Sequence, residues 1–241
     1  MVTKSLINQI QNLKQKKFRQ KTGLFVAEGE KLIQELLESN FKFTHLLTTE
    51  NITNFPAKII LKNEMKKLTH FKNASSYLGV FNIPNYSNDI NKKPDSVLVL
   101  DGISDPGNLG TIIRTCDWYG IKDLICSSDT VDCFNPKVVQ SSMGSISRVR
   151  CHYTDLLPFL KSSKLEIVGA SLKGTSMYDV NLNKKIIYVF GNESNGISTE
   201  VNNYIKNSIT IPKNKNNLKI DSLNVALSVG IIFSERHRQM N

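Results

Sequence analysis

The sequence has no long apolar run and no apolar block near its N-terminus. No stretch approaches the roughly 20 consecutive apolar residues of a transmembrane helix, so we expect no membrane-spanning segment. Residues 1–5 do not resemble a secretory signal. Residues 1–21 are basic and free of acidic side chains, as in a mitochondrial presequence, but Arg19 is their only arginine. The composition therefore favours a cytoplasmic protein.

Cysteine and histidine are scarce, with four of each in the chain. The cysteines form no C-x-x-C pair and the histidines show no ligand spacing, so we expect no zinc or other metal site. Reduced and mostly buried thiols are the expected state of the cysteines, which are Cys116, Cys126, Cys133 and Cys151.

Two nucleotide-binding patterns are missing as well. No G-x-G-x-x-G follows an apolar run, which argues against a dinucleotide site. Residues 169–175 have the glycine spacing of a phosphate-binding loop but lack the lysine that would precede Thr175. The segment instead predicts a turn of small residues after a strand, where the backbone can approach some other ligand closely.

The chain does carry a strong positive charge. Its 241 residues have a formal net charge of +10 and an isoelectric point of about 9.4. Such a charge favours a polyanionic partner through the release of counterions. A lysine-rich protein that binds no nucleic acid can have the same composition, so charge alone leaves both interpretations open. The hydrophobic fraction of 40% supports a folded core.

The pattern of residues 1–84 predicts a small α/β unit. Apolar residues at helical spacing predict a helix over 4–21 and a second helix after Glu30, with a helical turn at 64–68. Short apolar runs predict strands at 24–27, 43–47, 58–61 and 77–83. A polar stretch framed by prolines then predicts a linker at 85–94, although a long surface loop has the same composition.

Residues 95–241 predict a second and larger domain, a parallel sheet with helices on both faces. The predicted strands are 97–100, 124–126, 167–170, 186–190 and 208–211. The predicted helices after the first are 136–141, 155–162, 198–204 and 223–239. The first helix has an apolar stripe, and Asn108 could cap its start. Asp221 or Ser222 is placed to cap the last helix.

Three segments of this second domain place polar side chains just past apolar runs. They are 108–114 (NLGTIIR), 190–197 (FGNESNGI), and 211–212 (IP) with 222–226 (SLNVA). Polar groups at the ends of parallel strands are where open α/β sheets build ligand sites. In this order, the segments resemble motifs 1, 2 and 3 of the SpoU/TrmH family of RNA ribose 2′-O-methyltransferases. Residues 135–137 and 141–145 resemble the stretch between motifs 1 and 2, and residues 1–84 resemble the family's small substrate-binding domain.

The resemblance implies a catalytic domain with a C-terminal trefoil knot, S-adenosylmethionine as cofactor, and a homodimer formed through that domain. It implies methyl transfer to a ribose 2′-hydroxyl of structured RNA, with ribosomal RNA favoured over transfer RNA. A non-catalytic RNA-binding or ribosome-assembly protein of the same fold is the alternative. A knotted methyltransferase that acts on a base is a third interpretation. The pair Asn108 and Arg114 favours ribose over a base as the target.

The resemblance also implies the roles of individual residues. The implied catalytic residues are Asn108, Arg114, Glu193, Ser222 and Asn224. The implied cofactor-binding residues are Ser171, Phe190, Gly191, Asn192, Gly196, Ile211, Pro212, Ser222 and Leu223. The predicted RNA-binding residues are Lys14, Lys16, Lys17, Arg19, Lys21 and Arg114.

Two points depend on the residues themselves. An arginine side chain stays protonated at pH 7, so a neutral Arg114 that acts as a base would be costly, and we expect it to hold a phosphate and stabilise negative charge. Glu193 would then orient Arg114 or accept the proton. The loop 213–221 is longer and more basic than is usual in the family and lacks glycine. Its lysines at 213, 215 and 219 could contact RNA phosphate, or the loop could simply be solvated.

Overall fold

The computed structural model describes residues 1–51, 54–86, 97–214 and 221–241, and the chain forms two compact units. The first unit comprises Met1–Ser87 with Asp132–Arg148, and the second comprises Asn88–Val131 with Val149–Asn241. The segment Asp132–Arg148 thus packs with the first unit, whereas its place in the sequence predicts the second domain. From residue 87 on, the predicted linker at 85–94 lies outside the described residues.

The first unit is built on a mixed sheet of four strands in the order β1-β4-β2-β3. The strands are β1 (Leu24–Glu28), β2 (Phe43–Thr48), β3 (Lys58–Ile59) and β4 (Tyr77–Asn82). The helices are α1 (Lys4–Asn12), α2 (Lys16–Thr22), α3 (Glu30–Glu38), α4 (Lys62–Leu68) and α6 (Pro136–Ser142). Buried apolar side chains of α1, α4, β1 and β4 form one core cluster.

The first helix of the chain differs from its prediction. The hydrophobic pattern predicts one helix over 4–21, but the chain turns between α1 and α2. Arg19 donates hydrogen bonds to the carbonyl oxygens of Leu13 and Lys14 at 2.8 and 2.9 Å. A continuous helix would use those carbonyls for its own backbone hydrogen bonds, four residues along. Gly23, at a φ of 65°, ends α2.

The second unit contains a six-stranded sheet in the order β10-β8-β9-β5-β6-β7, and every neighbouring pair is parallel. Its strands are β5 (Val97–Asp101), β6 (Asp123–Cys126), β7 (Arg150–Tyr153), β8 (Glu166–Ser176), β9 (Ile186–Gly191) and β10 (Asn207–Thr210). Its helices are α5 (Pro106–Trp118), α7 (Leu156–Ser162), α8 (Thr199–Asn202) and α9 (Val225–Met240). The parallel α/β sheet is therefore confirmed, while the knot stays a prediction.

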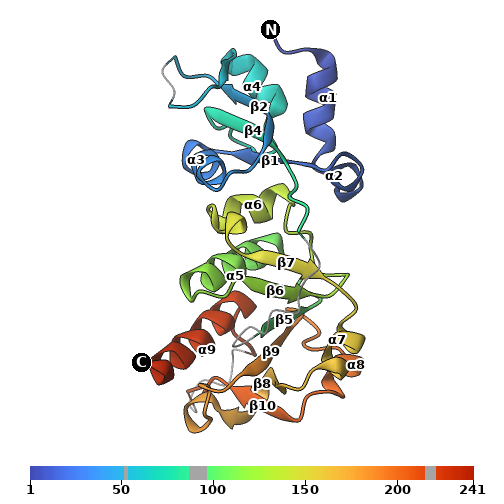
Figure 1. Cartoon of the computed structure of the whole chain (residues 1–241), viewed down its shortest axis with the longest axis vertical. Helices are drawn as coiled ribbons and strands as arrows, with labels where there is room; N and C mark the ends of the chain where they lie inside the picture. The colour runs from blue at the N-terminus through green and yellow to red at the C-terminus, as the bar shows by residue number, and fades with distance from the viewer. Residues whose placement is uncertain (52–53, 87–96, 215–220) are drawn as a thin grey trace. The chain divides into compact units, whose positions relative to one another are not determined.

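Helices cover both faces of this sheet, with α5 and α9 on one side and α7 and α8 on the other (Figure 1). On the α7 and α8 side, Val97 and Val99 pack with Leu156 and Val201. On the other side, the rings of Tyr188 and Phe233 lie 5.1 Å apart between β9 and α9. The predicted apolar stripe of α5 is fully buried at Leu109, Ile112, Ile113 and Cys116.

Two predicted helix caps were wrong, and one strand was missed. Asp105, rather than Asn108, caps α5, because its carboxylate accepts the N–H of Asn108 at 2.9 Å. Asn224, rather than Asp221 or Ser222, caps α9, with its side-chain oxygen accepting the N–H of Ala226 at 2.9 Å. Strand β7 was not predicted, because a polar edge strand such as Arg150–Tyr153 has no apolar run to mark it.

Candidate active site

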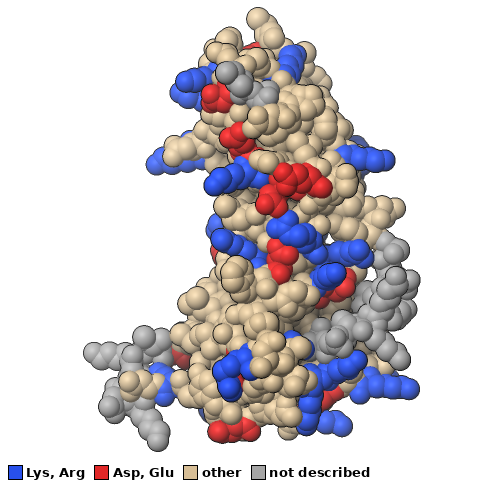
Figure 2. Space-filling model, turned by 60° about the vertical axis from the view of Figure 1, so that its left-hand side comes forward, with Lys and Arg blue, Asp and Glu red and all other residues tan. Residues whose placement is uncertain are grey.

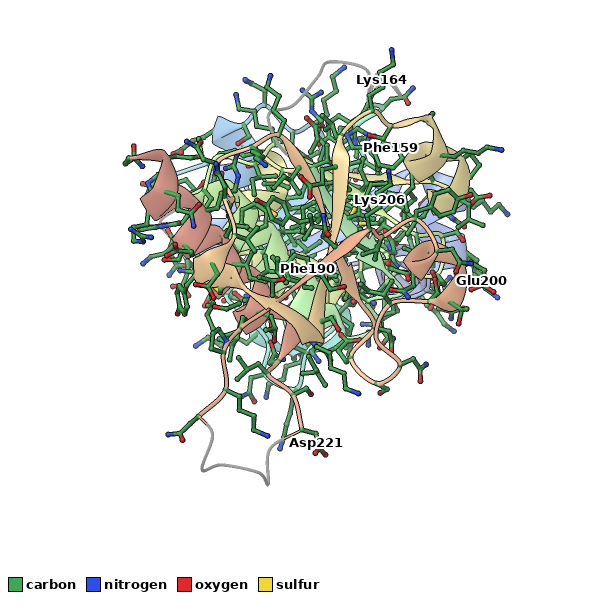
Figure 3. The ribbon with its side chains drawn as sticks, turned by 90° about the horizontal axis from the view of Figure 1, so that it is seen from below. Phe159, Lys164, Phe190, Glu200, Lys206 and Asp221 are labelled. Carbon is green, nitrogen blue, oxygen red and sulfur yellow. The ribbon has the colours of Figure 1, made fainter. Side chains whose placement is uncertain are left out.

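A cavity of about 970 Å³ opens beside the carboxyl ends of β8 and β9, with β10 and the start of α9 completing its wall. All of the predicted cofactor residues line this cavity: Ser171, Phe190, Gly191, Asn192, Gly196, Ile211, Pro212, Ser222 and Leu223. Figure 3 shows Phe190 in the middle of the view and Asp221 in its lower part. Of the loop lysines proposed to touch RNA, Lys213 lines the cavity, and Lys215 and Lys219 lie outside the described residues.

One wall of the cavity comes from an interruption of β8. Its pairing with β10 passes from Gly169 opposite Ser208 directly to Thr175 opposite Ile209, so residues 170–174 have no partner on β10. Gly174 approaches so closely that an added Cβ would lie 2.4 Å from the carbonyl oxygen of Ser208. The segment predicted as a turn continues β8 instead, and the small Gly174 allows close approach to the backbone of β10 rather than to a ligand. Residues 170–173 line the cavity.

A second wall is the loop that follows β9. Asn192 and Gly196 exchange two backbone hydrogen bonds of 2.9 Å and close the loop into a small hairpin. The side-chain oxygen of Asn192 accepts the N–H groups of Ser194 and Asn195, and its amide donates to the carbonyl of Gly102 at 2.6 Å. The side chain of Asn192 is thus engaged in holding the loop.

Glu193 projects from this loop toward the start of α5. Its carboxylate accepts the backbone N–H of Ser104 and of Asp105 at 3.2 Å each, the Ser104 hydroxyl at 3.0 Å and the Asn108 side-chain amide at 2.8 Å. Burial raises the pKa of Glu193, but these hydrogen bonds together outweigh burial and leave the pKa below its ordinary value. The side chain is therefore a firmly held carboxylate.

Asn108 continues the connection to the third segment. The side-chain amide of Asn224 donates to the side-chain oxygen of Asn108 at 2.8 Å, and Asn224 in turn caps α9. Glu193, Asn108 and Asn224 thus form one hydrogen-bonded chain through the three sequence segments. Glu193 and Asn224 both line the cavity, so this chain runs along its edge.

Known proteins resemble this chain over nearly its whole length. Residues 95–234 match the model of the SpoU rRNA Methylase family, and residues 4–75 match that of the MRM3-like substrate binding domain. The chain belongs to the SpoU rRNA methylase family. It is 27% identical to the Bacillus subtilis 23S rRNA (guanosine(2553)-2′-O)-methyltransferase RlmP, with 90% of each chain covered.

Solved structures resemble this SpoU protein closely. A putative RNA methyltransferase of the TrmH family from Porphyromonas gingivalis is 32% identical, with a TM-score of 0.85 over 99% of both chains. An rRNA methyltransferase from Sinorhizobium meliloti, solved with S-adenosylmethionine bound, is 27% identical with a TM-score of 0.85, covering 100% of this chain and 97% of the other. S-adenosylmethionine is therefore the cofactor of this SpoU protein.

The cavity suits that cofactor in size and chemistry. Its volume lies within the range of roughly 300–1,000 Å³ that is typical of small-molecule sites. Apolar side chains such as Leu172, Ile197 and Ile211 alternate with amides and hydroxyls along its walls. Such a lining can hold an adenine ring between apolar surfaces and still offer hydrogen bonds to a ribose and an amino-acid tail.

Arg114 lies apart from the chain of Glu193, Asn108 and Asn224. It is exposed on α5, six residues and about 9 Å of helix rise beyond Asn108. Within the described part of the chain it forms no ion pair, and it does not line the cavity. The three residues of the hydrogen-bonded chain are thus brought together, and Arg114 is left facing solvent.

The predicted RNA-binding residues fall into two groups. Lys14, Lys16, Lys17 and Lys21 are exposed around α2. Arg19, by contrast, is only 2% exposed, and the prediction that it binds RNA is wrong. Its guanidinium pairs with Asp132 at 2.6 Å and holds the turn between α1 and α2. Figure 2 shows basic side chains over the face in view, several with acidic neighbours.

All four cysteines are free, and three of them are buried. In the described ranges no three histidine, cysteine or acidic side chains come together as metal ligands. The longest described helix is α9, with 16 residues, and none of the described helices has the length and apolarity of a membrane span.

Proposed function

We propose that this SpoU protein transfers a methyl group from S-adenosylmethionine to a ribose 2′-hydroxyl of structured RNA, with ribosomal RNA as the substrate class. The observation that carries the proposal is the chain from Glu193 through Asn108 to Asn224 along the edge of the cofactor cavity. The similarity to RlmP, which spans 90% of both proteins, supports the choice of ribosomal RNA.

Different residues position the reactants and stabilise the charge that develops in the reaction. The cofactor supplies a methyl group that its sulfonium already activates, so the protein must position the hydroxyl and help to remove its proton. Asn108 and Asn224 lie where their amides can position the ribose and the cofactor loop. Arg114 carries a guanidinium that can hold a phosphate with two hydrogen bonds and stabilise the negative charge that develops on the ribose oxygen.

Glu193 fits a positioning role better than that of a general base. Four donors already occupy its carboxylate oxygens, and its lowered pKa makes it a weaker proton acceptor at pH 7. We therefore propose that Glu193 holds the first and second segments together and that it does not orient Arg114 within one protomer.

We also propose the homodimer that the family resemblance implies, together with a cytoplasmic location. The homodimer is supported by large apolar side chains exposed on α5 and at the start of α9: Trp118 is 84% exposed, Leu227 59% and Leu223 47%. We expect Trp118→Asp or Leu227→Asp to yield a monomer by size-exclusion chromatography with light scattering. Tyr178→Asp, at another exposed ring (60%), is the control that should remain dimeric.

The decisive test incubates the protein with methyl-labelled S-adenosylmethionine and separated, unmodified ribosomal or transfer RNA. Digestion to nucleosides should then show the label in a 2′-O-methylnucleoside from ribosomal RNA. Label in a modified base, or from transfer RNA alone, would contradict the proposal. Absence of transfer from all RNAs together with retained RNA binding would instead favour a non-catalytic RNA-binding protein.

A further inference from the structure

Asp101, the last residue of β5, is buried at the root of the loop that carries Glu193. Its side chain is 8% exposed, and one carboxyl oxygen accepts the backbone N–H of Ser198 at 2.7 Å. Asp101 lies directly opposite Gly191 in the pairing of β5 with β9. The loop 192–198 leaves β9 at Gly191, so Asp101 holds the far end of a loop that begins beside it.

The other end of the loop is held by Gly102, the residue that follows β5. The Asn192 side chain donates to the carbonyl of Gly102 at 2.6 Å, and Gly102 N–H donates to the Ser127 hydroxyl at 2.8 Å. Gly102 has a φ of 72°, and a Cβ there would lie 3.2 Å from a carboxyl oxygen of Asp129. Two consecutive residues, Asp101 and Gly102, thus fix the exit and the entrance of the loop.

The loop itself is tightly folded over β9. A Cβ on Gly191 would lie 2.1 Å from the carbonyl carbon of Gly196, so no larger side chain fits beneath the loop. The backbone hydrogen bonds between Asn192 and Gly196 fix the conformation of residues 192–196, but they do not determine the position of the loop relative to the sheet. That placement depends on the hydrogen bonds of Glu193 and on the two anchors, of which only the one at Ser198 uses a side chain of β5.

Asp101 does not act by touching the cofactor. The cavity of about 970 Å³ is lined by residues 190–197 of β9 and the loop, and Asp101 is not among its lining residues. Asp101 instead lines a separate cavity of about 340 Å³ together with Ser127, Thr154 and Ser198. Any influence of Asp101 on cofactor binding must therefore pass through the loop.

We propose that Asp101 is a positioning residue, whose bond to the Ser198 N–H sets the loop 192–198 against the cofactor cavity and aims Glu193 at Asn108. The proposal deepens the proposed function, because it rests on that cavity as the cofactor site. It assigns the affinity for S-adenosylmethionine in part to a buried carboxyl group that makes no contact with the cofactor.

The test measures the affinity of the full-length protein for S-adenosylmethionine by calorimetry, without RNA. Loss of a hydrogen bond to a charged group is worth enough to weaken binding about tenfold or more in Asp101→Ala. Asp101→Asn keeps an oxygen that can accept the Ser198 N–H, so its dissociation constant should stay within about threefold of the wild-type value. Unchanged binding by Asp101→Ala would overturn the proposal.

Ser198→Pro removes the donor of the same hydrogen bond. Ser198 has a φ of −61°, which proline adopts, and its side chain makes no capping hydrogen bond, so the change mainly removes the N–H. We expect Ser198→Pro to weaken cofactor binding about as much as Asp101→Ala, and the double variant to be no worse than either. Multiplying effects would show that the two residues act separately, and the proposal would fail.

Asp155→Ala is the matched control. Asp155 lies just past β7, lines the same smaller cavity as Asp101 and also accepts one backbone N–H, but its partner is Leu157 at 3.0 Å, outside the loop 192–198. Its loss should lower stability without changing the affinity for the cofactor. The calorimetry contains no RNA and so does not depend on the methylation assay. If the wild-type protein binds cofactor but methylates no RNA in that assay, the proposed function fails and the role of Asp101 stands.

Discussion

The side-chain amides of Asn108 and Asn224 share a hydrogen bond of 2.8 Å although 116 residues separate them in the chain. The bond joins the first turn of α5 to the start of α9, and Asn108 passes the connection on to Glu193. A single polar side chain thus connects the three segments that carry the family resemblance.

Asn108→Ala should therefore cost both stability and activity. It removes the bonds to Glu193 and Asn224 and should lower the free energy of unfolding by about 2–3 kcal/mol in a urea titration. Asn207→Ala is the control, because Asn207 also donates to a glutamate, Glu166 at 2.8 Å, but at an exposed position. Its effect should stay below about 1 kcal/mol. Equal losses in the two variants would contradict a special role for Asn108.

Arg114 should matter for the reaction but not for stability. Arg114→Ala and Arg114→Lys should each lower kcat by roughly 100-fold or more, because lysine cannot reproduce the planar two-bond contact to phosphate. The melting temperature should not change, since Arg114 is exposed. Arg150→Ala, at another exposed arginine of the same unit, should keep its activity. Near-wild-type kcat in Arg114→Lys would show that our role for Arg114 is wrong.

Arg19 should behave in the opposite way. Arg19→Met removes one partner of a buried ion pair with Asp132 and should lower the free energy of unfolding by about 3–5 kcal/mol. Lys21→Met, two residues along and exposed, should change it by less than about 0.5 kcal/mol in the same denaturation experiment. A stable Arg19→Met protein with weakened RNA binding would restore the original prediction.

The exposed lysines around α2 should contribute to RNA binding through charge. Changing Lys14, Lys16, Lys17 and Lys21 to glutamate should weaken binding and flatten the dependence of log K on log salt, because fewer counterions are released. The control is the same change at exposed lysines of the second unit: Lys122, Lys161, Lys164 and Lys206. If the changes around α2 leave RNA affinity and its salt dependence unaltered, these four lysines do not bind RNA.

His70 should make the protein sensitive to mild acid. Burial, and then the positive charges of Lys14 and Arg19, lower the pKa of His70 to about 4, although its hydrogen bond to the Ile10 carbonyl opposes this. The unfolded chain takes up the proton near pH 6.5 and the folded one does not. Stability should therefore fall as pH drops from 6.5 toward 4, by as much as roughly 3 kcal/mol from this group.

The measurement compares the free energy of unfolding of wild type and His70→Gln from pH 7 to pH 4. The glutamine amide can still donate to the Ile10 carbonyl but does not titrate, so the variant should lose less stability on acidification. Burial raises the pKa of the neighbouring Glu28, but that effect is common to both proteins and cancels. Parallel pH curves would rule out His70 as the source of the acid sensitivity.

Much of the fold could be predicted because its signals are local. The run Val97–Leu100 is buried on both faces of the sheet and forms most of β5. The stripe beginning at Leu109 forms the buried side of α5. The same reasoning failed at β7 and at the turn before α2, where burial of a polar side chain or pairing at a sheet edge decides the structure.

The residues that line the cavity could be predicted from the sequence, but their hydrogen-bond partners could not. The predicted cofactor residues all line the cavity, because family motifs and the ends of parallel strands both point there. No local pattern shows that Glu193 is held by Ser104 and Asp105, or that Asp101 anchors Ser198 across 97 residues. Such partners depend on the path of the folded backbone.

The sequence by itself determined the parallel sheet, the positions of most helices and strands, the family and its cofactor. Each of these depends on hydrophobic periodicity or on short motifs, which neighbouring residues specify. The tertiary structure alone decided which polar side chains meet: Arg19 with Asp132 across 113 residues, and Asn108 with Glu193 across 85. A buried polar group must find a partner, but only the folded backbone determines which one lies within reach.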